Sequence, residues 1–425
     1  MSSPSLLRQG LKAGELARAI FKAELPESVV RALPAQSVYM ALKINGVEAS
    51  SDLIALLTPE QYRSCLDFDL WNRDIFTEDH FWKWLEASDE DNTLEPLKRF
   101  LGSIDLKLIS IIIGRYIVTV VRDEPTDSPP GPMYYTPDNG YSWIHISIEN
   151  SDQHRLLAKL LAYIFETSAE LFYQLISIPT VSTESELVET AFQERISRVS
   201  DEGIPDTEIS FKINTPLPLA ELKTKLTKAK REHAIEYVPI IDPLLYESEN
   251  PDLVGNLAKT LHQMGEDREC NDFEAELSLI MNAALVRFSI NFWETEDVSK
   301  IAAKVKGALN IGLKLSKENS SLSEIEAFRV LGLQTIYRAG LAPILELSKI
   351  AQRLPKEVLE SIEHDAPIYG IVSAVRVLFP EYPNFLNGDG SYLEAEGKLL
   401  IGQRAFVDLG ETNLIKEILL SRFKN

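Results

Sequence analysis

Residues Leu33–Leu66 read LPAQSVYMALKINGVEASSDLIALLTPEQYRSCL, and this stretch decides the fold class. Pro34 and Pro59 each lie where an apolar helical pattern starts, because the missing N–H of proline costs little in the first turn of a helix. Thr58 is a good N-cap, and Gln61 completes a capping box with it. The stretch therefore predicts short helices that follow one another with proline or polar residues between them.

Similar short patterns continue on both sides of this stretch, over residues 25–122. Thr77–Leu85 and Leu94–Ile104 carry apolar residues at helical spacing. The repeated starts indicate a loose helical repeat, and such repeats bury their core between neighbouring units, as in α-solenoids. We expect residues 25–122 to form a superhelix-like stack of short helices, preceded by a weakly patterned N-terminal segment, residues 1–24.

The middle region, residues 123–250, is predicted to be helical with one β-hairpin over residues 133–148. Residues 123–132 are rich in proline and cannot form a regular helix. Two aromatic, β-prone runs then flank Asn139-Gly140, which is a strong hairpin signal. Because an isolated hairpin is marginally stable, this one should pack on helices.

The remainder, residues 251–425, contains the longest helical patterns. Apolar residues share one helical face over 277–285, and again over 301–313 and 325–341. We predict a C-terminal helical bundle. The chain as a whole is therefore expected to be mainly α, with a stack of short helices, a small β-hairpin insert and a bundle.

Charge and composition exclude several function classes. Of 425 residues, 43 are Lys or Arg and 64 are Asp or Glu, which gives a net charge of −21. A nucleic-acid binder neutralises phosphates with clustered basic residues, so this balance argues against one. It also disfavours binding to anionic lipid.

The apolar segments and the number of cysteines indicate the cellular compartment of the protein. The longest apolar stretch, Leu106–Val121, is interrupted by Lys107 and Arg115 and is shorter than the ~20 residues that span a bilayer. Residues 1–14 show no apolar signal core. Only two cysteines occur, which excludes a disulfide framework. We expect a cytoplasmic protein without an integral membrane segment.

Aromatic side chains are the main candidates for an interaction surface. Trp82 and Trp84 are two residues apart and cannot face the same side of a helix, so one of them is expected to be exposed. Exposed tryptophans often mark interfaces, whereas core packing is the alternative reading. The interaction candidates from this cluster and from the hairpin are Trp71, Trp82, Trp84, Tyr134, Tyr135 and Trp143.

Sequence motifs for catalysis or cofactor binding are missing. The chain has no HExxH, GxxxxGK[ST], GxGxxG or GxSxG pattern. We therefore assign no catalytic residue and expect no cofactor and no metal site. An enzyme with an unrecognised, metal-assisted site stays an alternative, using carboxylates with one of His145, His233 and His262.

Four stretches stand out by their order along the chain: Leu33–Gln36 with Tyr39, Thr58–Gln61 and Leu66–Trp71; Arg195–Asp206; Leu331–Gln334 with Ile336–Gly340; and Asp365–Pro367 with Gly402–Phe406. Together they resemble a family of bacterial proteins known only as a domain of unknown function. The family supplies no activity, substrate or catalytic residue. Residues 25–105 also resemble, more weakly, the intracellular superhelical domain of magnesium channels.

These observations favour a non-enzymatic protein-interaction or scaffold module. Superhelical stacks build extended binding surfaces, and the chain lacks catalytic motifs. A protein partner of unknown identity is expected, a basic or membrane-associated protein being one possibility, and the oligomeric state stays open. The alternatives are the enzyme described above and a regulatory protein that responds to divalent cations, which the magnesium-channel resemblance implies.

Overall fold

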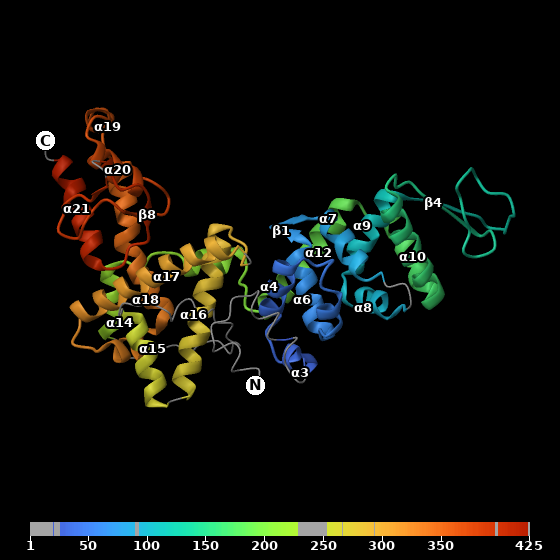
Figure 1. Ribbon diagram of the computed structural model, residues 1–425, viewed down its shortest axis with the longest axis horizontal. Coiled ribbons are helices and arrows are strands. Elements are labelled where there is room, and N and C mark those ends of the chain that lie inside the picture. The colour runs from blue at the N-terminus through green and yellow to red at the C-terminus, as the bar shows by residue number, and fades with distance from the viewer. Residues whose placement is uncertain are drawn as a thin grey trace. The chain divides into compact units, whose positions relative to one another are not determined.

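The computed structural model describes Ile20 and residues 26–89, 93–227, 253–265, 267–292, 294–395 and 398–423. These residues are mainly helical with small antiparallel sheets, which confirms the predicted fold class (Figure 1). They fall into two compact units, Met1–Glu202 and Gly203–Asn425, which we call unit 1 and unit 2. The predicted division into segments 1–24, 25–122, 123–250 and 251–425 stays a prediction, and segment 1–24 lies, apart from Ile20, outside the described residues.

Unit 1 begins with the predicted short helices, which range from 5 to 11 residues in length. Three longer helices follow a two-stranded ribbon. The elements are α3 (Pro26–Arg31), α4 (Ala35–Asn45), α5 (Ser51–Ala55), α6 (Pro59–Asp69), β1 (Trp71–Asn72), β2 (Ile75–Phe76), α7 (Glu78–Ala87), α8 (Glu95–Ser103), α9 (Leu106–Tyr116), β3 (Ile117–Val121), β4 (Ser142–Ile146), α10 (Ser151–Thr167), α11 (Ala169–Val181) and α12 (Glu184–Asp201).

The capping box predicted at Thr58 is present at the start of α6. The Thr58 hydroxyl accepts from the Gln61 N–H over 3.1 Å, and the Gln61 side-chain oxygen accepts from the Thr58 N–H over 3.0 Å. The Gln61 amide nitrogen also donates to the carbonyl oxygens of Val30 and Leu33, over 2.8 and 2.7 Å. The Gln61 side chain therefore caps the start of α6 and also bonds to carbonyl groups at and just after the end of α3, where helix carbonyls lack partners within their own helix. These hydrogen bonds connect neighbouring helices of the stack.

Helix α9 lies at the centre of unit 1 and packs against α11 and α12. Its interior face buries Leu108, Ile109 and Ile112. At Gly114 an added Cβ would come within 3.1 Å of the Pro179 side chain of α11, so the glycine permits close approach of the two helices. The apolar run that begins at Leu106 supplies this buried face.

The hairpin of unit 1 differs from its predicted pairing. Strand β4 pairs along its length with β3, from Ile117 opposite Ile146 to Val121 opposite Ser142. The predicted partner run, residues 133–135, reaches β4 only at one bridge, Tyr135 opposite Ile144. Residues 117–121 were expected to be helical, and that expectation is wrong, because their β-branched side chains favour a strand directly after α9. We call residues 117–146 the arm.

A second, smaller hairpin was not predicted. Strands β1 and β2 pair Trp71 with Phe76 and Asn72 with Ile75. The turn between them holds Arg73 at a φ of 60°, in the left-handed region that non-glycine residues seldom occupy. The segment contains no Asn-Gly or Asp-Gly pair, so the local sequence does not predict a hairpin turn.

Unit 2 contains the predicted helical bundle, in which α15, α16, α17 and α18 contact one another around an apolar core. Short strands and three further helices follow it. The elements are α13 (Thr207–Ile213), α14 (Leu219–Thr227), α15 (Leu253–Met264), α16 (Asp267–Phe288), α17 (Thr295–Glu318), α18 (Glu324–Gln352), α19 (Lys356–Ile362), α20 (Ala366–Val375), β5 (Tyr382–Pro383), β6 (Glu394–Ala395), β7 (Lys398–Leu399), β8 (Gln403–Arg404) and α21 (Leu409–Phe423).

Glycines allow α17 and α18 to pack backbone against backbone. A Cβ added at Gly340 would lie 1.7 Å from the carbonyl oxygen of Ala308. A Cβ at Gly312 would lie 1.9 Å from the carbonyl oxygen of Ile336. No side chain fits at either position, so this crossing depends on two glycines that face each other's helix.

No helix in the described part of the chain combines the length and apolarity needed to cross a bilayer. Cys65 and Cys270 do not form a disulfide: Cys65 is buried in unit 1, and Cys270 is half-buried in unit 2.

Candidate functional site

The predicted aromatic cluster belongs to the interior of unit 1. Trp71, Trp82 and Trp84 are all at most 5 % exposed. The expectation that one of Trp82 and Trp84 is exposed is therefore wrong. Opposite faces of α7 are both covered, because the rings of Phe81 and Tyr116 pack against Trp82 while the ring of Tyr62 lies 5.5 Å from that of Trp84.

The aromatic candidates on the arm differ in exposure. Trp143 is 6 % exposed, and its indole N–H has no hydrogen-bond partner among the described residues. Tyr134 is half-buried, with its ring centroid 5.3 Å from that of His145. Tyr135 is exposed at the surface. An interaction role for any of the six candidates stays a prediction.

A group of titratable side chains surrounds Asp69 at the end of α6. Asp69 is 2 % exposed. Its carboxylate accepts hydrogen bonds from Tyr39 over 2.5 Å, Lys43 over 2.6 Å and the Trp84 indole over 2.8 Å. The Nδ1 of His80 lies 2.7 Å from the Asp69 carbonyl oxygen and 3.3 Å from the carboxylate. We call these five residues the Asp69 network.

Hydrogen bonding sets the charge states in the Asp69 network. Burial raises the pKa of Asp69, but hydrogen bonds from His80, Lys43 and Tyr39 outweigh burial and hold that pKa well below its usual range. Burial and the neighbouring carboxylate raise the pKa of Tyr39. The network therefore holds a buried anion among donors, which is the arrangement of a structural cluster, and none of its members lines the cavity described below.

The contact between His80 and Asp69 predicts that the free energy of unfolding depends on pH. Its hydrogen bond to Asp69 raises the pKa of His80 above the ordinary value of about 6.5. Protonated His80 thus stabilises the fold fully below about pH 6.5, and this contribution is lost as the pH rises through the raised pKa. We expect the difference in unfolding free energy between the wild type and His80→Gln to shrink from pH 6 to pH 9 in urea titrations. A difference that grows over that interval would contradict this assignment.

The histidines considered for a metal-assisted site belong to different parts of the chain. His145 lies in unit 1 and His262 in unit 2, where the Nε2 of His262 is 3.5 Å from Glu274. His233 lies outside the described residues. Within the described ranges, no three His, Cys, Asp or Glu side chains form a group that could hold a metal ion.

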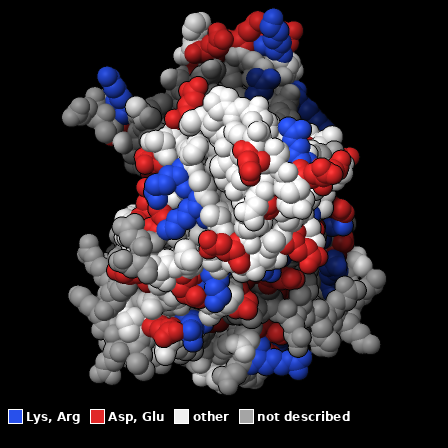
Figure 2. All heavy atoms as spheres, turned by 90° about the vertical axis from the view of Figure 1, so that its right-hand side faces the viewer, with Lys and Arg blue, Asp and Glu red and all other residues white. Residues whose placement is uncertain are grey.

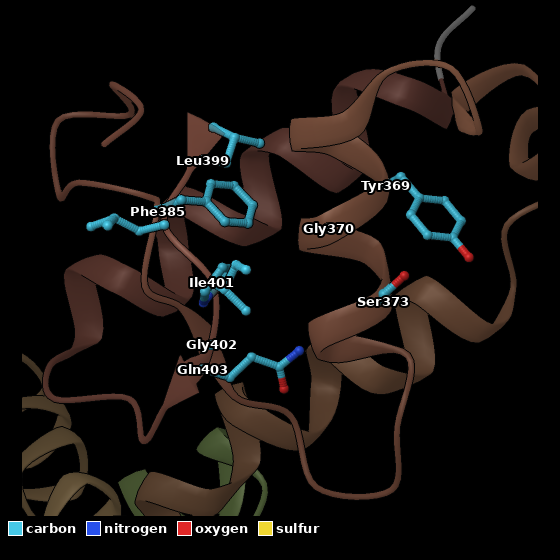
Figure 3. Close-up of a pocket in the computed structure, with 10 residues that line it drawn as sticks. Tyr369, Gly370, Ser373, Phe385, Leu399, Ile401, Gly402 and Gln403 are labelled. Atoms are coloured by element: carbon cyan, nitrogen blue, oxygen red, sulfur yellow. The ribbon is translucent and has the colours of Figure 1, made fainter. Parts of the chain in front are cut away.

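An apolar cavity of about 260 Å³ opens in unit 2. One wall is α20, and the other is the chain from β7 into β8 (Figure 3). In Figure 3 the side chains of Phe385 and Ile401 lie between these walls, with Gln403 extending from the β8 side. The lining residues are Tyr369, Gly370, Ser373, Pro383, Phe385, Leu399, Leu400, Ile401, Gly402 and Gln403.

Local geometry positions each wall of this cavity. Tyr369 and Ser373 are four residues apart and share the outer face of α20, while Ile368 and Val372 are buried beneath them. Gly370 has no Cβ, and an added Cβ would lie 2.9 Å from the Phe385 ring. The ring of Phe385 can therefore pack directly on the helix and close the floor of the cavity.

The opposite wall depends on a glycine and on an ion pair. Gly402 has a φ of 107°, and its carbonyl oxygen accepts from the Asn384 N–H over 3.0 Å. Beyond it, Arg404 forms a bidentate pair with Glu411 over 3.2 and 2.5 Å and stacks 4.5 Å above the ring of Tyr382. Burial raises the pKa of that tyrosine to about 12. These contacts fix β8 and the segment before it.

The rim of the cavity exposes large apolar side chains. Ile401 is 97 % exposed, and Tyr369 and Leu400 are also exposed. The surface continues through Leu393, whose N–H donates to the Phe385 carbonyl over 2.6 Å, and through Tyr392, whose ring lies 6.1 Å from that of Phe385. We call Tyr369, Tyr392, Leu393, Leu400 and Ile401 the apolar rim.

The chemistry of the cavity favours binding over catalysis. Among the ten lining residues, only Tyr369 is titratable, and none is a carboxylate, histidine, lysine or cysteine. General acid–base and nucleophilic catalysis both require such groups within reach of the substrate. The volume is also below the ~300–1,000 Å³ of typical small-molecule sites. The cavity fits one or two apolar side chains.

Sequence reasoning missed this cavity. The one local signal is Leu399-Leu400-Ile401 followed by Gly402, three large apolar residues next to a residue suited to a left-handed turn. α20, which supplies the facing wall, lies about thirty residues earlier in the chain, so the juxtaposition arises only on folding.

Comparison with known proteins identifies a family model that covers most of the chain. A sequence model described as a family of unknown function (DUF6178) matches residues 6–391, which is most of the chain. A search of curated proteins found no match. A search of solved structures found none either. The resemblance to a family of unknown function is thus confirmed, and nothing in these comparisons supports the resemblance to magnesium channels.

Proposed function

This chain belongs to the DUF6178 family of unknown function, and we propose that it is a non-enzymatic protein-interaction module whose binding site is the cavity of unit 2 with its apolar rim. The observation that carries this proposal is an apolar cavity without catalytic groups, surrounded by exposed apolar side chains. Apolar patches of this kind mark interaction sites, because leaving them in water is unfavourable.

The cavity suggests an anchor side chain from a protein partner. Deep apolar pockets at interfaces receive aromatic or aliphatic anchors that carry most of the binding free energy. Ser373 and Gln403 add hydrogen-bonding groups beside the apolar walls. Such a pocket would orient a short segment that presents one large apolar residue.

The net charge of the chain segment that supplies the cavity favours a basic partner segment. Residues 356–404 contain eight Asp or Glu and four Lys or Arg, a net charge of 4 − 8 = −4. Complementary charge steers association and selects partners. We therefore propose that the partner presents an apolar anchor flanked by Lys or Arg. We propose that the complex forms in the cytoplasm, since Cys65 and Cys270 do not form a disulfide.

Photo-crosslinking tests the proposal in cells that produce the protein. A photoreactive phenylalanine analogue in place of Ile401 should yield covalent adducts with one dominant protein. The same analogue in place of Val181, which is 80 % exposed in unit 1, should not yield that adduct. Equal adducts at both positions, or none at position 401, would refute the site.

Filling the cavity gives the quantitative prediction. Once the crosslinked protein has been purified, Ser373→Trp should weaken its binding at least tenfold, about 1.4 kcal/mol, because the indole occupies the space of the anchor. Ser361→Trp makes the same change on an exposed serine of α19 that does not line the cavity, and its affinity should stay at the wild-type value. Isothermal titration calorimetry measures both. Unchanged affinity in Ser373→Trp would exclude the cavity as the binding site.

A further inference from the structure

Strand β3 leaves one backbone edge without a partner. On β4, Ile144 exchanges both backbone hydrogen bonds with Tyr135, over 3.0 and 2.8 Å, so its N–H and C=O point away from β3. Thr119 lies opposite Ile144. In an antiparallel pair, two residues that lie directly opposite each other either both bond to the facing strand or both point away from it, and the two kinds of pair alternate. The backbone groups of Thr119 therefore also point away from β4.

The hydrogen bonds at both ends of the β3–β4 pair agree with an outward direction for the backbone groups of Thr119. The Arg122 N–H donates to the Tyr141 carbonyl, and the Ser147 N–H donates to the Tyr116 carbonyl, each over 2.8 Å. Even-numbered residues of β3 therefore bond to β4, and odd-numbered ones face outward. No backbone partner is found for Thr119 or Val121 anywhere in the described ranges. Open edges of this kind accept a further strand.

The side chains of β3 are accessible and uncharged. Val118 is 48 % exposed and Val121 is 68 % exposed. Figure 2, viewed from the side on which the arm lies in Figure 1, shows a broad uncharged surface with charged side chains mainly around it. The strand contains no charge, no proline and no bulge, so it lacks the features that normally protect an edge from pairing.

The sequence of β3 fits a second copy of itself. Ile-Val-Thr-Val-Val is nearly the same read in either direction. An antiparallel pair centred on Thr119 places Ile117 opposite Val121 and Val118 opposite Val120, all favourable cross-strand pairs. The Ile117 N–H already donates to the Ile113 carbonyl at the end of α9. The outward groups are therefore the N–H and C=O of Thr119, the N–H of Val121 and the C=O of Ile117, and the same register aligns these donors with these acceptors. Two-fold dimers of this closed type are the commonest protein oligomers.

We propose that two copies of this chain associate through β3, as an antiparallel strand pair centred on Thr119, which makes one continuous sheet from two arms. This surface is separate from the cavity of unit 2, since all of its residues belong to unit 1. The interaction supplies a second binding function: dimerisation would present two cavities to a partner.

Sedimentation velocity of the full chain over a wide concentration range tests this proposal. The wild type should show a monomer–dimer equilibrium. Thr119→Pro removes only an outward N–H and keeps the β4 ladder, and proline is tolerated at such edge positions. It should weaken dimerisation at least tenfold. Thr119→Val retains the N–H and should dimerise as the wild type does. A wild type that stays monomeric, or a dimer unaffected by Thr119→Pro, would overturn the proposal.

Crosslinking gives a readout that does not depend on how proline is tolerated. Thr119→Cys in a Cys270→Ser background should be joined by a short bis-maleimide into a covalent dimer, since opposite Cβ atoms would lie roughly 4.5–5.5 Å apart. Cys65 is buried and provides no competing thiol. Asp152→Cys, at an exposed position on α10, is the matched control and should not give the dimer. Equal crosslinking at both positions would reject the β3 interface.

Discussion

Gly340→Ala should destabilise unit 2 by about 3 kcal/mol or more, because the new methyl group meets backbone and not a side chain that can move. The added Cβ would lie 1.7 Å from the Ala308 carbonyl oxygen and 2.9 Å from the Gly312 nitrogen. α17 and α18 form the central pair of the bundle, so separating them opens the core. Urea unfolding followed by circular dichroism measures the loss.

A glycine in open space provides the matched control for this substitution. Gly388 lies in the same unit, and an added Cβ there meets no atom within 4 Å. Gly388→Ala should change the unfolding free energy by less than about 0.5 kcal/mol, or raise it slightly by restricting the unfolded chain. Similar stabilities for the two variants would show that the helices separate readily and that the backbone contact is unimportant.

Asp69→Ala should have the second large effect, a loss of about 3–5 kcal/mol in the unfolding free energy at neutral pH. The substitution removes the carboxylate that accepts from the buried Tyr39 hydroxyl and the buried Trp84 indole, and it removes one partner of Lys43. Unpaired buried donors are costly because they have lost water as well as the carboxylate. Asp69→Asn keeps the shape and should lose less.

The control for Asp69 is a nearby acidic residue at the surface. Asp79 is exposed in the first turn of α7, where only the helix dipole stabilises it, so Asp79→Ala should cost about 0.5 kcal/mol. A loss below 1 kcal/mol in Asp69→Ala would mean that water or another acceptor takes over the hydrogen bonds of the carboxylate, and the Asp69 network would not stabilise unit 1 as proposed.

Local signals explain which parts of the fold were predictable from sequence. The start of α6 was predicted because Thr58, Pro59 and Gln61 act within one turn, and the structure shows the same capping box. The long helices of the bundle were predicted from apolar periodicity alone. Residues 117–121 were misread because Leu106–Val121 is one apolar run, and periodicity does not separate a buried helix from a strand. Their β-branched composition was the overlooked signal.

The candidate site was less predictable because its parts are distant in sequence. Tyr369 and Ile401 line the same cavity only after α20 and the segment before β8 have packed on the same core. The tryptophans were the obvious candidates by residue type, but Trp84 is buried against Asp69, fifteen residues earlier, which no helical spacing within α7 reveals. Composition identified the interaction-prone residue types, whereas tertiary packing decides which of them are exposed.

The buried thiol of Cys65 makes the opening of unit 1 observable. Cys65 is fully enclosed, its Sγ lies 4.0 Å from the Ala35 carbonyl oxygen, and burial raises its pKa, so it reacts with a thiol reagent only when unit 1 opens. Cys270 is half-buried in unit 2 and does not need that opening. In a Cys270→Ser background, the alkylation rate of the remaining thiol therefore reports how often unit 1 opens under native conditions. The chain thus carries its own kinetic probe of local unfolding, and no added label is needed.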